Sequence, residues 1–370
     1  MAAEPWFDEY MKHTFHGKRL SAIVAVVPEQ EKKFEDEFPR YKLSPGKAER
    51  MKEMLGLGRH RIAPPEVCSS DLCCAAALHL IDSGKLKRDD IGAIVFVTQT
   101  PDYFLPPTSN VLQSRLGLGT DVICLDLNQG CAGALIGIMQ AFMLLELPAV
   151  KKVLVLAGDT ASKQVSAWNR VSYPLVGDAG CALVVERADP TETIHMALKM
   201  DGGRHEALIV PAGAYRHPSS VDTLPEIEVE EGVMRSQEQI HMDGGSIFNF
   251  TIEDVPPQIA ETLAFSGDTH DTIERFFFHQ PNRFMLQQMA QKIGVAESKM
   301  PNDIVGLYGN CSSVSIPLVI CHHDGKDLLA KKKRVCLSGF GVGLTWCTMV
   351  MNLGPLDACE IIDYAGAPVK

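Results

Sequence analysis

The feature that most constrains the fold of this chain is a repeated alternation of short apolar runs with longer helical segments. Runs rich in β-branched residues occupy residues 20–27, 91–99, 121–128 and 151–159. They show little alternation of polar and apolar side chains, which is typical of strands that helices cover on both faces. Helical segments follow at residues 108–118 and 131–146. This order predicts an α/β fold with helix-covered sheets.

The second half of the chain repeats this plan loosely. Residues 273–280 and 303–310 are interpreted as strands that lead into helices at residues 282–294 and 312–323. Residues 333–353 are expected to close the chain with two strands around a glycine-rich turn. Cys131 and Asn310 would then lie at equivalent strand ends of two similar halves.

The composition narrows the class of protein. A formal net charge of −11 argues against nonspecific nucleic-acid binding, which needs Lys and Arg to neutralise phosphates. No apolar run reaches the ~18–20 residues that cross a bilayer, and the N-terminus lacks the pattern of a signal peptide. These features predict a cytoplasmic protein without membrane insertion.

Eleven cysteines are scattered through apolar segments rather than set in a disulfide framework. Most are expected to be reduced and to act as small core residues. Cys68, Cys73 and Cys74 lack a second pair at zinc-finger spacing, so no metal site is predicted.

Cys131 differs because it lies between an apolar run and a helix, with Gly130 and Gly133 beside it. The positive end of a helix dipole stabilises a thiolate there and can lower the pKa of the thiol. The glycines allow a substrate to approach the backbone closely. The position predicts a nucleophile, and a buried cysteine at a helix start is the alternative.

Two polar residues occupy comparable places in the second half. His279 follows three successive phenylalanines, where it is either a catalytic residue or a hydrogen-bonded histidine of the core. Asn310 precedes a predicted helix and would equally serve as its N-cap. The glycine-rich turn at residues 339–345 lacks the lysine of a phosphate-binding loop. Its N–H groups could face an oxyanion, or the turn could be a simple hairpin.

Together these segments resemble the ketoacyl-ACP synthase III family of the thiolase superfamily. The motifs are GCAG at Cys131, HQPN at His279, YGNCSS at Asn310 and GFGVGLTW from Gly339, with VGDAG at residues 176–180 as a further signature. Their order, along nearly the whole chain from about Gly17, makes the resemblance specific.

The resemblance implies a thiolase-like αβαβα sandwich of two duplicated βαβαβαββ halves, usually as a homodimer. It divides the chain into an N-terminal extension (1–17), a half with the Cys nucleophile (18–200), connecting and substrate loops (201–240) and a half with His and Asn (241–370). These boundaries follow from the positions of the motifs.

The resemblance also implies a decarboxylative Claisen condensation with no bound cofactor. Cys131 would accept an acyl group from a thioester of coenzyme A or of an acyl carrier protein. His279 and Asn310 would bind the carbonyl of a malonyl-type thioester and promote its decarboxylation. The N–H groups of Cys131 and Val342 would hold the acyl oxyanion, with Phe340 as a gate.

Two pocket positions are assigned in the same way. Leu105 matches a residue that reaches into the acyl pocket of the partner subunit. Ala134 stands where Phe is common, which would reshape the pocket. Together with the N-terminal extension and the distinct 201–238 region, the reshaped pocket favours a specialised pathway over the initiation of fatty-acid synthesis.

The expected donor site departs from the family pattern. Arg170 matches an arginine on one face of the coenzyme A adenine, but Arg50 falls where an aromatic would stack on the other face. A carrier-protein donor is therefore favoured over coenzyme A. Arg283 and Lys292, on the predicted helix after His279, are candidate carrier-docking residues.

Other families of the thiolase superfamily fit these motifs less well. A biosynthetic thiolase needs a second cysteine in the closing glycine turn, whereas Cys336 lies before that turn. A hydroxymethylglutaryl-CoA synthase needs a glutamate that no motif supplies. A chalcone-synthase-like enzyme shares a similar turn, but HQPN and GCAG favour synthase III. An acyltransferase to a hydroxyl or amine, and a non-catalytic partner subunit of a heterodimeric synthase, stay open.

Overall fold

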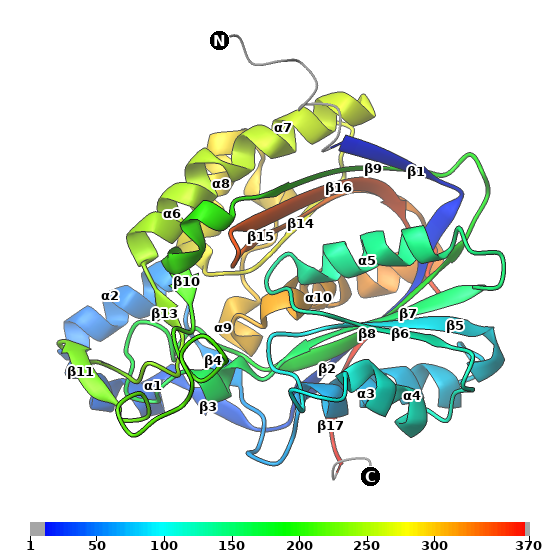
Figure 1. The fold of residues 1–370 in the computed structure, drawn as a ribbon. Coiled ribbons are helices and arrows are strands. Elements are labelled where there is room, and N and C mark those ends of the chain that lie inside the picture. The colour runs from blue at the N-terminus through cyan, green and yellow to red at the C-terminus, as the bar shows by residue number, and fades with distance from the viewer. Residues whose placement is uncertain (1–11, 367–370) are drawn as a thin grey trace, which may run out of the picture.

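A computed structural model describes residues 12–366 of the protein (Figure 1). Residues 1–11, the larger part of the predicted N-terminal extension, lie outside the described residues. The remainder of that extension forms β1, Lys12–His16, an edge strand of a large sheet. The folded sandwich therefore begins before Gly17.

The first sheet has six strands in the order β17-β2-β8-β7-β5-β6. Their bounds are β2 Lys18–Pro28, β5 Ile91–Val97, β6 Ile123–Leu127, β7 Lys152–Asp159, β8 Ala179–Arg187 and β17 Ala358–Tyr364. β5 pairs in parallel with β6 and β7, whereas β8 is antiparallel to its neighbours β7 and β2. Each of the four apolar runs predicted as strands in the first half lies in this sheet.

The second sheet has five strands in the order β1-β9-β16-β15-β14. The bounds not yet given are β9 Thr193–Met200, β14 Arg275–Phe278, β15 Lys333–Gly341 and β16 Thr345–Leu353. The two sheets exchange strands across the predicted halves of the chain. β9 precedes residue 201 yet lies in the second sheet, and the C-terminal β17 lies in the first.

Three layers of helices enclose the two sheets, which gives the αβαβα sandwich (Figure 1). α3 (Ser69–Asp82) and α4 (Thr108–Arg115) cover the outer face of the first sheet. α5 (Gly133–Leu144) and α10 (Ser315–Ala330) lie between the sheets. α6 (Gly244–Glu253), α7 (Val255–Ser266) and α8 (Arg283–Ile293) cover the second sheet. The predicted fold class is thus confirmed.

The sequence of each helix fits its layer. α5 reads GALIGIMQAFML, which is apolar on nearly every side, as a helix between two sheets must be. Its Phe142 packs in the central core with Val155 of β7 and Met349 of β16. α8 is amphipathic and turns Leu286 and Met289 toward the second sheet. None of the helices in the described part of the chain is long and apolar enough to cross a membrane.

The smaller elements lie around the large sandwich. They are α1 Phe34–Glu37, α2 Pro45–Leu55, α9 Val305–Tyr308, β3 Glu31–Lys33, β4 Arg59–Arg61, β10 Leu208–Ile209, β11 Ile227–Glu230, β12 Val233–Arg235 and β13 His241–Met242. The predicted strand at residues 303–310 is wrong, because α9 occupies its centre. Periodicity cannot separate a strand from a helix in so short an apolar run. Asn310 consequently follows a helix and a glycine turn rather than a strand.

The carboxyl ends of parallel strands meet at one edge of each sheet, where ligands bind in open α/β folds. In the first sheet, β5 ends just before Gln99, β6 ends before Cys131, and β7 ends at Asp159. In the second sheet, β14 ends before His279 and β15 ends at Gly341. The fold thereby brings residues from five strands to one place.

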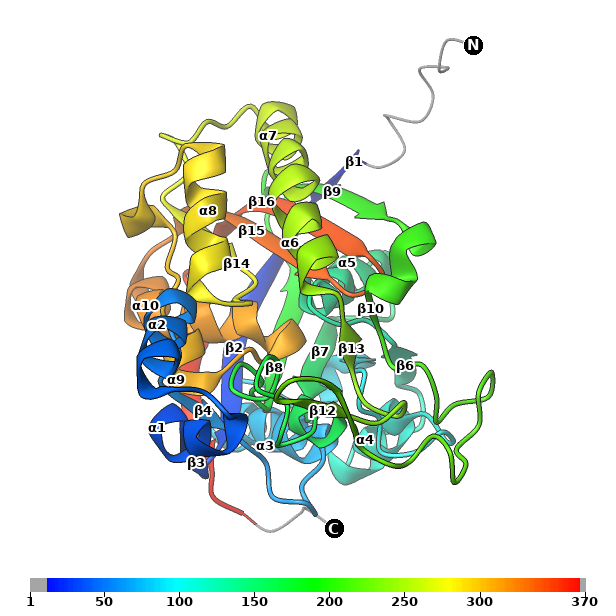
Figure 2. The same cartoon turned by 90° about the vertical axis from the view of Figure 1, so that its left-hand side faces the viewer.

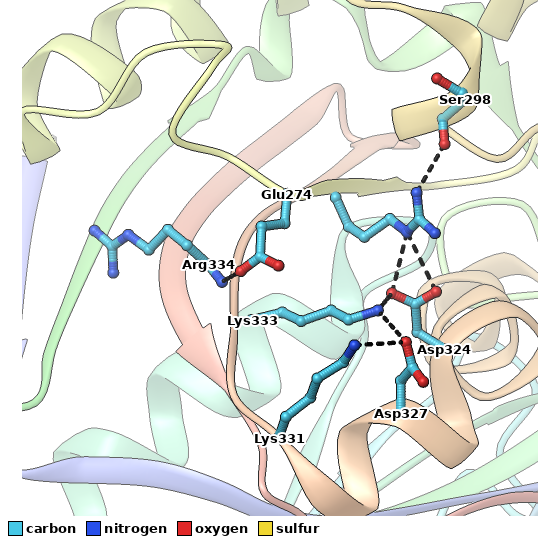
Figure 3. A network of polar contacts seen from close by, with 8 residues as sticks. Glu274, Ser298, Asp324, Asp327, Lys331, Lys333 and Arg334 are labelled. Atoms are coloured by element: carbon cyan, nitrogen blue, oxygen red, sulfur yellow. Dashed lines mark hydrogen bonds and ion pairs between the residues drawn. The ribbon is translucent and has the colours of Figure 1, made fainter.

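A buried ion network fixes α10 against the opposite end of β14 and β15 (Figure 3). Nζ of Lys333 lies 2.7 Å from Asp324 and 2.8 Å from Asp327. Arg275 bonds Asp324 as well and donates to the carbonyl oxygen of Ser298. The network therefore joins the elements that carry His279, the closing turn and the loop after Asn310.

Candidate active site

A cavity of about 490 Å³ opens at these strand ends and contains all three residues of the predicted triad, Cys131, His279 and Asn310. Phe340 and Val342 of the closing turn line it as well. Most of the remaining wall is apolar and comes from α2, α6, α8 and residues 165–176 and 208–210. The cavity therefore offers a few polar groups at its base and an apolar passage toward them.

Cys131 lies at the start of the central helix, in a tight backbone setting. α5 begins at Gly133, and Ala132 is its N-cap, so Cys131 immediately precedes the cap. A Cβ atom on Gly341 would lie 2.7 Å from the Cys131 sulfur. Only glycine leaves room for the thiol at that point of the closing turn.

The expectation that the helix start lowers the pKa of Cys131 is wrong. Burial raises the pKa of the Cys131 thiol to about 11, although the backbone N–H of Val342 and the Ser312 hydroxyl oppose this shift. The free energy needed to take a thiolate out of water exceeds the stabilisation that one helix dipole gives it. Cys131 is therefore a neutral thiol near pH 7, and its reaction needs a proton acceptor.

His279 is held at the base of the cavity by a hydroxyl. Its Nδ1 atom lies 2.7 Å from Oγ of Ser315, which lies 2.8 Å from the carbonyl oxygen of Ser312. The imidazole stands edge-to-face against the ring of Phe340, with centroids 5.6 Å apart. Burial lowers the pKa of His279 to about 3, so the ring is neutral and Nε2 is the nitrogen left for a ligand.

Asn310 is oriented by two backbone contacts and one side-chain contact. Its N–H donates to the carbonyl oxygen of Leu175, and its own carbonyl accepts from Gly177 in the VGDAG segment. The side-chain Oδ1 accepts from the N–H of Ser312 at 3.0 Å. Since Oδ1 is engaged, the amide NH₂ remains as the hydrogen-bond donor. Asn310 does not cap α10, whose N-cap is Val314.

Ser312 connects the three residues of the triad. It adopts a left-handed backbone conformation with φ of 49°, which is rare for a residue other than glycine. Its N–H binds Asn310, its carbonyl oxygen binds the Ser315 hydroxyl beside His279, and its own hydroxyl influences Cys131. Backbone strain of this kind is concentrated at functional sites.

Comparison with known proteins places this site in a family. Residues 125–202 match the family described as 3-oxoacyl-[acyl-carrier-protein (ACP)] synthase III, and residues 263–353 match its C-terminal part. A Campylobacter jejuni protein named as a 3-oxoacyl-[acyl-carrier-protein] synthase 3 is 32% identical over 96% of this chain and 99% of its own length. The chain belongs to the 3-oxoacyl-ACP synthase III family. It is accordingly a condensing enzyme and an acyltransferase.

Solved synthase III structures agree with this assignment. A 3-oxoacyl-(acyl-carrier protein) synthase from Burkholderia xenovorans is 33% identical, covers 95% of this chain and 99% of its own, and superposes with a TM-score of 0.88. A beta-ketoacyl-[acyl-carrier-protein] synthase III from Thermus thermophilus is 26% identical, covers 91% and 99%, and gives a TM-score of 0.78. The predicted family and its thiolase-like fold are confirmed.

The other predicted residues of this synthase III lie outside the cavity wall. Ala134 is buried in the central core, and Leu105 is 76% exposed in a loop with Phe104. The Arg170 side chain covers Gly232, and Arg283 packs against Gly56 at the end of α2. Figure 2 shows α2 beside α8 at this side of the molecule.

The remaining cation, Lys292, is exposed near the far end of α8. Nine helical positions, or roughly 13 Å at 1.5 Å per residue, separate it from Arg283. The two candidate docking residues therefore occupy opposite ends of one helix, and only Arg283 adjoins residues of the cavity wall, Asn282 and Phe284.

Sequence reasoning missed three polar residues of this synthase III site: Asp159, Ser312 and Ser315. Asp159 lines the cavity, and the two serines hold Asn310 and His279. A signal for Asp159 was present, because a carboxylate ends the apolar run at residues 151–159. The serines carried no signal beyond the YGNCSS motif.

One cluster of possible metal ligands is formed by Asp303, His322 and His323, whose ligand atoms lie within 4.8 Å of one another. Nε2 of His323 lies 2.7 Å from Oδ1 of Asp303, and Nδ1 of His322 lies 3.3 Å from the Tyr308 hydroxyl. These contacts account for the cluster as hydrogen bonds between α10 and the segment at residues 303–308. Its residues are not part of the cavity wall.

Proposed function

We propose that Cys131 is the nucleophile that carries the acyl group and that His279 and Asn310 act on the extender thioester. The observation that carries this proposal is the placement of all three at the base of one cavity, joined through Ser312. Among the cysteines that the structure describes, Cys131 alone lines this cavity.

The first half-reaction would load Cys131. Its sulfur attacks the carbonyl carbon of an acyl thioester, and the donor thiol leaves. Negative charge then develops on the carbonyl oxygen, where backbone N–H groups stabilise it. The N–H of Val342 points toward the Cys131 sulfur, which supports its assignment, with the N–H of Cys131, to this oxyanion.

The second half-reaction would use two neutral donors. As carbon dioxide leaves a malonyl-type extender, charge develops on the thioester oxygen, which suits the Asn310 amide and Nε2–H of His279. This role requires the His279 tautomer with its hydrogen on Nε2, in which the Ser315 hydroxyl donates to Nδ1 of His279 in place of the Ser312 carbonyl oxygen. The resulting carbanion attacks the acyl-cysteine and forms the new C–C bond.

The donor site supports a carrier-protein thioester, with a coenzyme A thioester as the second candidate. Arg50 is exposed on α2, while Met51, Met54 and Phe284 make the passage apolar. Phe284 stacks on Phe248 at 5.8 Å between centroids. Such a passage fits a pantetheine arm, and its two aromatic rings stack on each other rather than on either side of an adenine. Arg170, Arg283 and Lys292 would bind phosphate or acidic carrier residues.

We also propose a homodimer in which the loop at residues 103–105 contacts the partner subunit. This loop exposes Tyr103, Phe104 and Leu105 by 60, 77 and 76%. Contiguous exposed apolar residues mark interaction sites. A cytoplasmic location, a specialised pathway and the absence of a bound cofactor stay predictions.

The nucleophile is tested by intact mass. Wild-type protein exposed to a panel of acyl-CoA and acyl-carrier thioesters should gain one acyl group. Cys131→Ala should gain none, while Cys124→Ala, which removes a partly exposed cysteine away from the cavity, should load normally. Continued loading of Cys131→Ala would overturn the assignment.

A further inference from the structure

Two glutamine side chains line the active cavity without a part in the proposed reaction. Gln99 follows β5 at the end of the first sheet, and Gln164 ends the short helical turn after β7. Both residues are half-buried. Because most of the cavity wall away from the triad is apolar, two amides on it need an explanation. Polar groups placed in an apolar pocket usually fix the orientation of a ligand and select it.

The amide of Gln99 lies directly beside the segment that carries the nucleophile. A Cβ atom on Gly130 would lie 2.3 Å from Oε1 of Gln99 and 2.4 Å from Cγ1 of Val342. Gly130 immediately precedes Cys131, and Val342 follows Gly341, which lies against the Cys131 sulfur. The lack of a side chain at residue 130 therefore gives the Gln99 amide its place next to the group that would carry the acyl chain.

The backbone of Gln99 is anchored, whereas its amide is not. The N–H of Gln99 donates to Oδ1 of Asp159 at 2.7 Å, and its carbonyl oxygen accepts from Nε2 of Gln164 at 3.5 Å, a long hydrogen bond. Among the residues that the structure describes, no hydrogen bond is made by Oε1 or Nε2 of Gln99, or by Oε1 of Gln164. The two neighbouring amides therefore offer both oxygen acceptors and N–H donors to a ligand in the cavity.

The two glutamines and the extender-binding His279 come from opposite sheets. β5 and β7 belong to the first sheet, β14 leads to His279 from the second, and α5, which follows Cys131, lies between them (Figure 1). Since the extender is assigned to the side of His279, the glutamines lie on the side left for the acyl group on Cys131. An acyl chain there displaces water from both amides, and a plain hydrocarbon cannot replace the lost hydrogen bonds.

We propose that the acyl group loaded on Cys131 carries a hydroxyl close to its carbonyl carbon, and that Gln99 and Gln164 bind this hydroxyl. A hydroxyl donates one hydrogen bond and accepts others, as does an amide with its oxygen and its NH₂ group. An oxo group only accepts and would leave the amide oxygens unpaired. The substrate class is therefore a hydroxyacyl thioester. This inference rests on the proposed role of Cys131 as the acyl carrier.

The test compares pantetheine thioesters that differ only by the hydroxyl. Butyryl is paired with 2- and 3-hydroxybutyryl, and octanoyl with 2- and 3-hydroxyoctanoyl, so that short and longer chains are both covered. Loading of the wild type is followed by intact mass, at thioester concentrations below saturation. At least one hydroxyacyl thioester should load roughly 10–100-fold faster than its unsubstituted partner, because the partner leaves amide groups unpaired in a buried site.

Gln99→Met links the preference to the amide. Methionine is unbranched and apolar, and the backbone N–H that binds Asp159 remains. This variant should lose the preference for the hydroxyacyl thioester and load the unsubstituted partner at least as fast as the wild type. Gln164→Met should lower the preference as well, whereas Gln291→Met, on the exposed side of α8 outside the cavity, should keep it. If Gln99→Met does not fold, as judged by thermal unfolding, the wild-type comparison and Gln164→Met decide.

Three results would overturn the inference. The wild type could load the unsubstituted member of every pair as fast as its hydroxyacyl partners. Gln99→Met could keep the full preference, which would place the hydroxyl elsewhere. Gln99→Met could slow both members of a pair equally, which would indicate a structural role. Failure of the proposed function looks different, because the wild type would then gain no acyl group from any thioester, or Cys131→Ala would still gain one.

Discussion

Burial favours the uncharged form of both titratable residues of the triad. The thiol of Cys131 and the imidazole of His279 each lose hydration at the base of the cavity, so the charged form of each is disfavoured. Hydroxyls and N–H groups, rather than formal charges, then orient them. A site of this kind stabilises charge as it develops during the reaction rather than holding it beforehand.

Asn310 should separate the two half-reactions. Asn310→Asp keeps the acceptor that binds the N–H of Ser312 but loses the amide donor. We expect loading of Cys131 to persist and condensation to fall roughly 10²–10³-fold, the usual loss for one oxyanion donor. Loading is measured by intact mass and condensation by product formation from a malonyl thioester.

Asn310→Ala, which loses acceptor and donor together, serves as the comparison. Loading of Cys131 should persist in this variant too, and condensation should fall at least as far as in Asn310→Asp. If either variant condensed at the wild-type rate, Asn310 would have no role in the reaction of the extender thioester.

At the scale of elements, the site depends on how α10 is held against β14 and β15. Burial disfavours the charged form of Lys333, but the hydrogen bonds that its ammonium donates to Asp324 and Asp327 outweigh this effect and raise the pKa of Lys333. The Lys333 side chain is only 7% exposed, so an unpaired charge there would be costly (Figure 3). These contacts lie at the end of the strands away from the cavity.

Asp324→Ala should therefore destabilise the protein by about 3 kcal/mol, the low end for breaking a buried pair, because Asp327 still binds Lys333. Lys331→Ala removes only an exposed partner of Asp327 and should cost ~0–1 kcal/mol. Urea unfolding monitored by circular dichroism measures both. Equal effects of the two substitutions would contradict this account of the network.

α8 carries the two cations predicted to dock a carrier protein. Arg283→Glu should raise the KM for an acyl-carrier substrate about fivefold, the equivalent of about 1 kcal/mol for one exposed pair, and added salt should reduce the effect. Lys292→Glu, at the other end of α8, should have the smaller effect. The rate with a minimal thioester should not change. An unchanged KM for both variants at low ionic strength would place carrier docking elsewhere.

The whole molecule presents an apolar loop that its own fold does not cover. The ring of Phe104 lies beside that of the similarly exposed Tyr215, at 6.0 Å between centroids. Leu105→Asp should therefore leave the thermal stability of the monomer unchanged while shifting a dimer toward monomer in analytical ultracentrifugation. Leu105→Met keeps an apolar side chain and should leave the assembly unchanged. A dimer unaffected by Leu105→Asp would remove this loop from the interface.

Local patterns in the sequence predicted most of the long strands, the closing turn and the helices after Cys131 and His279, and they singled out the three residues proposed as the triad. They did so because periodicity and turn chemistry act over a few residues, and because the motifs GCAG, HQPN and YGNCSS carry the family resemblance. The tertiary structure alone decided that β9 and β17 cross between sheets, that residues 305–308 form a helix, and that the Cys131 thiol is neutral. It also brought Asp159 and Ser312, distant in sequence, into one cavity with Cys131. Burial and long-range contacts depend on every packed layer at once, so no local pattern reports them.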